Sequence, residues 1–249
     1  MPPGTEIENP VPRPLFRLAD TLTAGVMQLG SSLRAARVFH PDGIAHRAQV
    51  VIRPPREDGA APVGVAFLDD PGRYDAIVRF SRGASLPEPL PDILGVALRV
   101  VDAHGPGLDQ DLLFGSSLDV PLGRELLLPT IGFRGTTLST VLPYRLGSAG
   151  TFWLGGRVTD ASGDPLVHLR DLDHRIAADD VRLQLRAAHR FGGWRTLADV
   201  ELGERLSDEE SGAIGFNVDE NTGGGIAPVG FLQALRRHAY AASQAARRR

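Results

Sequence analysis

Short segments in which apolar and polar residues alternate fill the middle of the chain, and they restrict the fold more than any other feature. Val181, Leu183 and Leu185 alternate with arginine and glutamine. Successive side chains of a β-strand point to opposite faces, so this alternation predicts a strand with one buried face. The sequence predicts further strands at residues 46–54, 75–81, 93–101, 111–114, 151–158, 165–172 and 194–202.

Helical patterns lie on both sides of this strand-rich middle. Apolar residues recur at helical spacing between residues 15 and 36, and residues 228–249 are rich in alanine, leucine, glutamine and arginine. Residues 120–144 are predicted to be irregular, with a helix on the flank, because proline and glycine interrupt their apolar runs. Successive strands between terminal helices describe an α+β protein with an antiparallel sheet or barrel.

No linker divides the chain convincingly, so we expect one domain over residues 1–249, with residues 1–14 as a proline-rich extended arm. The amino terminus lacks the basic start and apolar core of a signal peptide, and no stretch has the length of a membrane-spanning helix. We therefore expect a cytoplasmic protein. The formal net charge of -3 gives no global indication of nucleic acid or a membrane surface.

Cysteine is absent from the sequence. Its absence excludes disulfides, iron–sulfur clusters and a thiolate-ligated haem. Lysine is absent as well, so every permanently basic side chain is an arginine. Arginine is a better partner for carboxylates than lysine. If a tyrosine is a metal ligand, there are three candidates, because the chain contains only Tyr74, Tyr144 and Tyr240.

The first candidate site is the pair Arg236 and Tyr240 in the helical pattern at the carboxyl end. Residues four positions apart lie on one face of a helix. An adjacent positive charge favours the ionised phenol, whose ordinary pKa is about 10. Tyrosinate is a hard anionic ligand suited to ferric iron, and tyrosine is one of the axial ligands of haem iron. The plain alternative is a surface arginine beside a half-buried tyrosine.

Two further candidate motifs lie far away in the sequence. Arg37 and His40 stand shortly before Gly43, while Arg79 and Ser81 lie in the predicted strand 75–81. With a period of two, Arg79 and Ser81 share one strand face, which indicates a polar or anion site or, alternatively, a salt bridge at a sheet edge. The remaining histidines are assigned no chemical role: His46, His104, His168, His174, His189 and His238.

In order and character, these three motifs resemble the catalase superfamily. There, an Arg-Val-x-His-x-x-Gly segment carries the distal histidine, a Val-Arg-Phe-Ser strand supplies an arginine and a serine, and an Arg-x-x-x-Tyr helix supplies the proximal ligand. The length and the ending of the chain are similar to those of small catalase-related haem peroxidases. The resemblance implies a catalase-like antiparallel β-barrel with flanking N- and C-terminal helices, and haem b bound between the barrel and the C-terminal helix.

The resemblance also implies how the cofactor is held. Tyr240 would be the axial iron ligand, and Arg236 would be its charge partner. Arg37 and Arg79 would hold the haem propionates, because buried carboxylates require cationic partners.

For catalysis, the resemblance implies that His40 is the distal acid–base group. It also implies that Ser81 accepts a hydrogen bond from His40, which fixes the tautomer of the histidine. Catalases place an asparagine soon after the strand that begins here at Asp111, whereas this chain has Ser116 and Ser117 as weak substitutes. This departure favours an oxidoreductase of the peroxidase type, acting on hydrogen peroxide or on organic and lipid hydroperoxides, with weak catalase activity at most.

Three other functions stay open at the level of sequence. They are a haem or lipid carrier of the same fold without turnover, an enzyme that rearranges fatty-acid hydroperoxides, and a haem-free barrel that binds a small apolar ligand. The expected partners are a small-molecule hydroperoxide and an unidentified reductant, with no nucleic acid and no membrane span. The sequence is compatible with a homo-oligomer and does not decide it.

Overall fold

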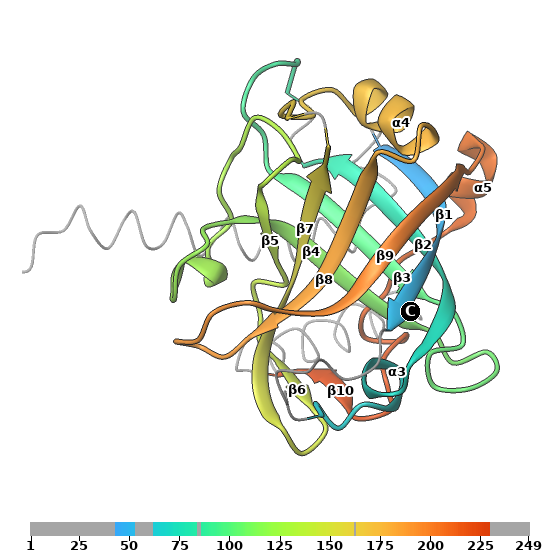
Figure 1. Ribbon diagram of the computed structural model, residues 1–249, viewed down its shortest axis with the longest axis vertical. Helices are drawn as coiled ribbons and strands as arrows, with labels where there is room; N and C mark the ends of the chain where they lie inside the picture. Colours follow the sequence, from blue (N-terminus) through green and yellow to red (C-terminus); the bar gives the residue numbers. More distant parts are fainter. Residues whose placement is uncertain (1–42, 53–61, 84–85, 162, 230–249) are drawn as a thin grey trace, which may run out of the picture.

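The computed structural model describes residues 43–52, 62–83, 86–161 and 163–229 (Figure 1). The strands are β1 (Gly43–Ile52), β2 (Gly72–Arg82), β3 (Leu94–Val100), β4 (Gln110–Ser117), β5 (Thr137–Ser139), β6 (Tyr144–Leu146), β7 (Gly150–Asp160), β8 (Val181–Ala188), β9 (Arg195–Arg205) and β10 (Ile226–Pro228). The helices are α3 (Ala66–Asp69), η1 (Gly123–Glu125), α4 (Leu169–Ala177) and α5 (Asp208–Ala213). The predicted arm at 1–14 and the predicted helices at 15–36 and 228–249 lie outside these ranges, except for Pro228, which ends β10, and Val229, whose N–H donates to the Pro143 carbonyl.

Eight of the described strands form a closed antiparallel barrel (Figure 1). Their order is β1-β2-β3-β4-β5-β7-β8-β9, and β9 pairs again with β1. Strand β6 pairs with the first residues of β7, and β10 pairs with β6. The predicted antiparallel barrel is therefore confirmed, and closure removes the free strand edges that an open sheet would expose.

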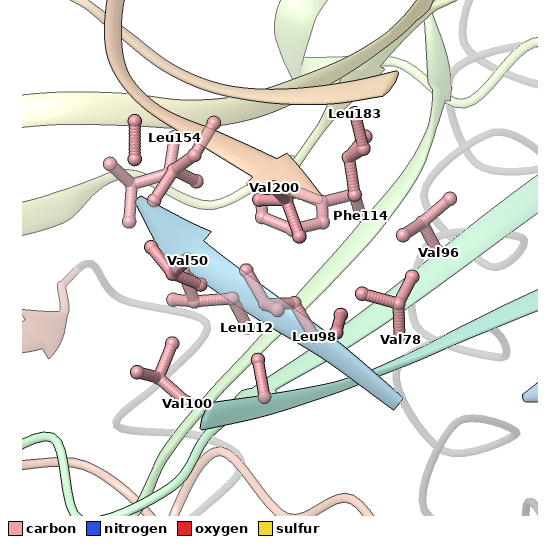
Figure 2. Close-up of a cluster of buried hydrophobic side chains, with 14 of the residues drawn as sticks. Val50, Val78, Val96, Leu98, Val100, Leu112, Phe114, Leu154, Leu183 and Val200 are labelled. Carbon is pink, nitrogen blue, oxygen red and sulfur yellow. The ribbon is translucent and has the colours of Figure 1, made fainter. Parts of the chain in front are cut away.

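The barrel interior is an apolar core made by every second residue of the strands. Val78, Leu98 and Leu112 stand opposite one another on β2, β3 and β4, and each is fully buried. Val50 and Val200 join them from β1 and β9 (Figure 2). Because side chains alternate between faces, the residues one position along these strands point away from the core.

Residues 165–172 are not the predicted strand. They form a loop, in which Leu166 has a φ of 53°, and the first turns of α4. Leu172 and Ile176, four residues apart, are the buried residues of α4, which packs beside β1, β8 and β9. A short apolar run cannot distinguish a helix from a strand by periodicity alone, which is why the prediction was wrong.

Residues 120–144 combine irregular structure with η1, as predicted, but they also contain β5. This strand has only three residues, and all are buried. A segment so short carries no measurable alternation, so its place in the barrel comes from pairing with β4 and β7. Within the described residues, no helix is long and apolar enough to cross a membrane.

Candidate functional site

The outer face of β1 to β4 carries a line of residues with very small side chains. Gly43 of β1 stands opposite Ser81 of β2, Ser81 opposite Gly95 of β3, and Gly95 opposite Gly115 of β4. Phe80, next to Ser81, is fully buried in the core, so Ser81 and its partners point to the outer face. We call these four residues the small-residue row. It leaves the barrel wall without bulky side chains at this level.

Arg79 lies in the neighbouring line on the same face, between Ala45 and Ala97. A β-carbon built on Gly43 would lie only 2.4 Å from Arg79 Nη2 and 2.6 Å from Cζ. The guanidinium therefore rests against the Gly43 backbone, and a larger side chain there would displace it. Burial lowers the pKa of the Arg79 guanidinium, but arginine stays charged in proteins. The result is a half-buried positive charge at one end of the small-residue row.

Ser81 supplies a buried hydroxyl in the middle of this face. The residue is 6% exposed, and its Oγ forms no hydrogen bond with another residue of the described ranges. A β-carbon on Gly95 would lie 2.8 Å from that oxygen, so glycine at this position leaves room for the hydroxyl. This oxygen is not among the fully buried side-chain atoms without a partner, so it is open to a hydrogen bond from a group placed against the outer face.

An apolar side chain covers the row at its other end. A β-carbon on Gly115 would lie 2.3 Å from Leu127 Cδ2, so Leu127 packs directly on this glycine. The leucine is held there because the Leu128 N–H donates to the carbonyl of Ser116 at 2.8 Å. The Ser116 hydroxyl donates to the Leu128 carbonyl at 2.6 Å and accepts from the Leu94 N–H at 3.1 Å. It is fully engaged in holding this loop, which counts against Ser116 as the substitute for an asparagine.

Of the predicted site residues, Arg79 and Ser81 are described by the structure, and they share the outer face of β2 as the two-residue period predicts. The other four lie outside the described residues: Arg37, His40, Arg236 and Tyr240. Their positions therefore remain predictions from the sequence.

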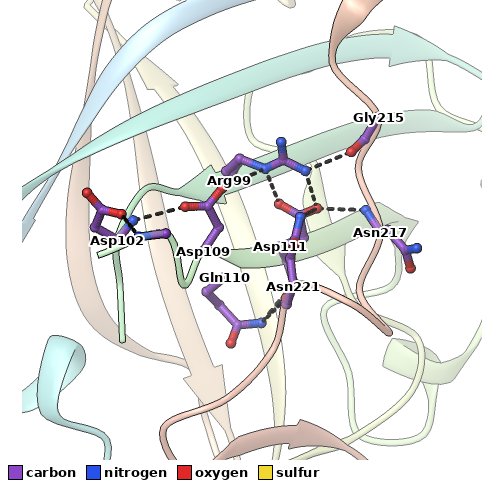
Figure 3. A network of polar contacts seen from close by, with 9 residues as sticks. Arg99, Asp102, Asp109, Gln110, Asp111, Gly215, Asn217 and Asn221 are labelled. Atoms are coloured by element: carbon purple, nitrogen blue, oxygen red, sulfur yellow. Dashed lines mark hydrogen bonds and ion pairs between the residues drawn. The ribbon is translucent and has the colours of Figure 1, made fainter. Parts of the chain in front are cut away.

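The structure adds a buried polar network that sequence reasoning missed (Figure 3). Asp111, fully buried on β4, accepts two hydrogen bonds from Arg99 of β3, at 2.8 and 2.7 Å. The same carboxylate accepts from the Asn217 backbone N–H at 2.6 Å and from Asn221 Nδ2 at 2.9 Å, while Arg99 also donates to the Gly215 carbonyl at 2.7 Å. The hydrogen bond from Arg99 to Asp111 raises the pKa of that arginine.

This network fastens residues 215–221 to the outer face of β3 and β4, beside the candidate site. The available signal was that Arg99 and Asp111 are charged residues inside predicted strands. Their pairing across 12 positions depends on strand register, which the sequence alone does not determine.

The described residues contain no group of three or more histidine, cysteine, aspartate or glutamate side chains that could hold a metal ion.

No protein-family model matches the sequence, and no curated protein matches it significantly. Among solved structures, the chain is similar to a fungal catalase with a TM-score of 0.52 and 11% sequence identity, over 79% of this chain and 56% of the catalase. A bacterial catalase aligns with a TM-score of 0.49 and 11% identity, over 76% and 52% of the two chains. The chain thus spans little more than half the length of these catalases. The first likeness shows that the barrel has a catalase-like fold.

Proposed function

We propose that the protein is a haem-dependent peroxidase that reduces hydrogen peroxide or organic and lipid hydroperoxides, with weak catalase activity at most. The observation that carries the proposal is the outer face of β2, where Arg79 and the buried Ser81 hydroxyl stand beside glycines on a catalase-like barrel. The three sequence motifs support the same function, because they appear in the order in which the catalase superfamily uses them.

The described residues fit the demands of haem b. A flat macrocycle needs a wall without bulky side chains, and Ser81 and Gly95 provide one between Arg79, which lies over Gly43, and Leu127, which lies over Gly115. Its propionates need a cation that remains charged where water is scarce, and Arg79 is such a group. The distal side needs a hydrogen-bond acceptor for a histidine, and Ser81 has a buried hydroxyl with no hydrogen bond in the described ranges.

Tyr240 is the proposed axial ligand, with Arg236 as the charge that favours its phenolate. The other two tyrosines have structural roles: Tyr144 is buried in the core, and Tyr74 packs edge-on against Phe67 with ring centroids 6.0 Å apart. With Tyr74 and Tyr144 occupied in packing, Tyr240 is the tyrosine left as a candidate ligand, in agreement with the Arg236-x-x-x-Tyr240 motif. Arg37 is the proposed second propionate partner beside Arg79.

Haem b, when bound, supplies an iron centre that binds a hydroperoxide oxygen and accepts its oxidising equivalents. The chain itself moves the proton. His40 would take the proton of the hydroperoxide and return it to the oxygen that leaves as water or an alcohol. The Ser81 hydroxyl accepts the N–H of the other ring nitrogen, which fixes the tautomer. A reductant would then supply two electrons and two protons, so that one hydroperoxide gives one molecule of alcohol or water and the second oxygen also leaves as water.

Weak catalase activity follows from the apolar end of the site. Catalase turnover requires a second hydrogen peroxide to be oriented as the reductant. Leu127 covers Gly115, the Ser116 hydroxyl is already engaged, and the Ser117 hydroxyl donates to the Thr137 carbonyl at 3.4 Å. Among the described residues, neither serine is therefore left as a ready substitute for an asparagine in that task. An unoriented second peroxide reacts more slowly because the alignment of reactants supplies much of a rate enhancement.

The test compares oxygen evolution with oxidation of an aromatic dye at equal peroxide, for the wild type and for His40→Ala. Removing the acid–base group should slow dye oxidation by about 100- to 10,000-fold while haem stays bound. The wild type should release little oxygen. Vigorous oxygen release would contradict the peroxidase assignment, and an unimpaired His40→Ala would contradict the mechanism. Bound haem without turnover in the wild type would indicate a carrier.

A further inference from the structure

Two neighbouring loops expose large apolar side chains. The loop between β4 and β5 exposes Leu118, Val120 and Leu122 to 46, 50 and 54%, and the turn between β8 and β9 exposes Phe191 to 76%. We call these four residues the apolar tip. Figure 1 shows both loops projecting from the same side of the barrel. Exposed apolar residues gathered in one place mark interaction sites rather than ordinary surface.

The two loops are held together as one surface. Arg124 of η1 is almost completely buried and donates to the carbonyls of His189 and Gly192 in the β8–β9 turn, at 2.8 and 2.7 Å. Arg190 of the same turn pairs with Glu125 at 3.4 Å. These contacts fix the β8–β9 turn against η1, so the apolar residues of both loops are presented together.

Leu122 adopts a backbone conformation that non-glycine residues rarely adopt, with a φ of 69°. Burial of its own side chain does not compensate for this strain, because the leucine is more than half exposed. Leu118 and Val120 pack over Gly123, where a β-carbon would lie 2.6 and 2.8 Å from them. Strain that the surrounding structure enforces is concentrated at functional sites. Here it holds a leucine out toward solvent.

A basic cluster lies directly behind the apolar tip. Arg124 and Arg186 both lie over the ring of Trp194, with their Cζ atoms 4.7 and 5.3 Å from its centroid. Arg157 is a diagonal neighbour of Arg186 on the outer face of β7 and β8. Burial lowers the pKa of Arg186, as do the charges of Arg157 and Arg124, while Asp119 opposes the shift.

The positive charge of this cluster is only partly balanced. Asp119 is the one acid that acts on Arg124 and Arg186 among the described residues. The Nη1 of Arg186 and the Nε1 of Trp194 are buried without a hydrogen-bond partner in the described part of the chain. The whole chain carries a formal charge of -3, so this excess is local. An anionic partner would relieve the repulsion among the arginines.

We propose that the apolar tip and the basic cluster together dock the protein on the surface of an anionic phospholipid bilayer. Protruding loops can insert apolar side chains between lipid chains, while the positive charge of the basic cluster attracts anionic headgroups to this side of the protein. The charge of the basic cluster is the reason for choosing an anionic bilayer. The protein has a net negative charge, so only a locally basic side can approach an anionic surface. The inference does not depend on haem binding, and it would place the protein where lipid hydroperoxides form.

The experiment measures co-sedimentation of the full-length protein with vesicles. The vesicles contain phosphatidylcholine alone or phosphatidylcholine mixed with phosphatidylglycerol. We expect binding to the mixed vesicles only, and we expect added salt to weaken it. Leu122→Asp and Phe191→Asp should each weaken binding about tenfold or more, because each removes apolar insertion and adds repulsion. Arg186→Gln and Arg157→Gln should each weaken it about fivefold.

Leu108→Asp is the matched control. Leu108 is 58% exposed in the turn between β3 and β4, at the other end of β4 from the apolar tip. It should bind like the wild type, and equal melting temperatures would show that all variants are folded. Equal binding to neutral vesicles, or equal loss in Leu108→Asp, would overturn the proposal. A dimer that Leu122→Asp abolishes would also overturn it. So would a melting temperature that inorganic phosphate raises in a protein that does not bind vesicles.

Discussion

At the scale of single residues, two buried serines, Ser81 of β2 and Ser116 of β4, have different tasks. The Ser116 hydroxyl donates to the Leu128 carbonyl in the loop that carries Leu127 and accepts from the Leu94 N–H of β3, whereas Ser81 makes no side-chain hydrogen bond within the described ranges. Ser116→Ala should lower the free energy of unfolding by about 1–3 kcal/mol, because it leaves buried backbone groups unpaired. Ser81→Ala should leave it nearly unchanged. Urea denaturation of both variants checks this, and an equal loss in the two would show that Ser81 is structural.

The sequence predicted the shared face of Arg79 and Ser81, because a two-residue period depends only on local geometry. It did not predict that Arg79 rests on Gly43 or that Leu127 covers Gly115. The first contact follows from the register of β1 against β2, and the second from the path of a loop. Neither is encoded in a local pattern, since both depend on where distant segments meet.

At the scale of elements, α4 packs against the barrel through a buried histidine. His46 of β1 is 1% exposed, its Nδ1 lies 3.0 Å from the Gly203 carbonyl, and its Nε2 lies 3.3 Å from Asp173 of α4. Burial lowers the pKa of His46, although the Gly203 carbonyl and the Asp173 carboxylate oppose the shift; Arg205 adds to the lowering. The carboxylate is also bound by Arg205, at 2.7 Å.

A lowered pKa makes the stability of the barrel depend on pH. As the pH falls below about 6.5, the unfolded chain takes up a proton at His46 that the folded chain does not, so stability decreases until the folded pKa is passed. His46→Gln cannot take up this proton. Its free energy of unfolding should therefore fall less than that of the wild type between about pH 7 and pH 5. Parallel pH profiles from urea denaturation would contradict this assignment.

The network around Asp111 fixes residues 215–221 on the barrel, and its loss should be costly. Asp111→Ala removes the buried carboxylate of Arg99 and leaves only Asp109, at 3.6 Å, and breaking a buried ion pair costs about 3–5 kcal/mol. Arg47→Ala is the control, because Arg47 and Glu210 form an exposed pair 3.0 Å apart, and such pairs contribute little. The two variants are compared by urea denaturation, and similar losses would show that the network does not anchor the segment.

Long strands with one buried face could be predicted from the sequence, as β8 and β9 show. The three-residue strands β5, β6 and β10 could not, because their pairing comes from neighbours rather than from their own pattern. Helix α4 was missed for a related reason: its buried face has only Leu172 and Ile176.

At the scale of the whole molecule, positive charge and exposed apolar side chains are concentrated on one side of the barrel. The amino-acid composition does not show this concentration. A net charge of -3 gave no sign of the basic cluster, because opposite charges elsewhere cancel it. Closure of the barrel brings the loops after β4 and β8 together, and Arg124 joins them. Surfaces of this kind depend on the complete topology, so reading the chain in order does not reveal them.

The central claim for the whole molecule is that this barrel binds haem b through Tyr240. The most direct measurement is the absorption spectrum of the purified protein after haem is added, for the wild type and for Tyr240→Phe, Tyr144→Phe and Tyr74→Phe. We expect the wild type and the last two variants to show the same haem spectrum, and Tyr240→Phe to lose most of its bound haem, because phenylalanine offers no oxygen to the iron. A wild-type spectrum in Tyr240→Phe, or a wild type that takes up no haem, would contradict the claim.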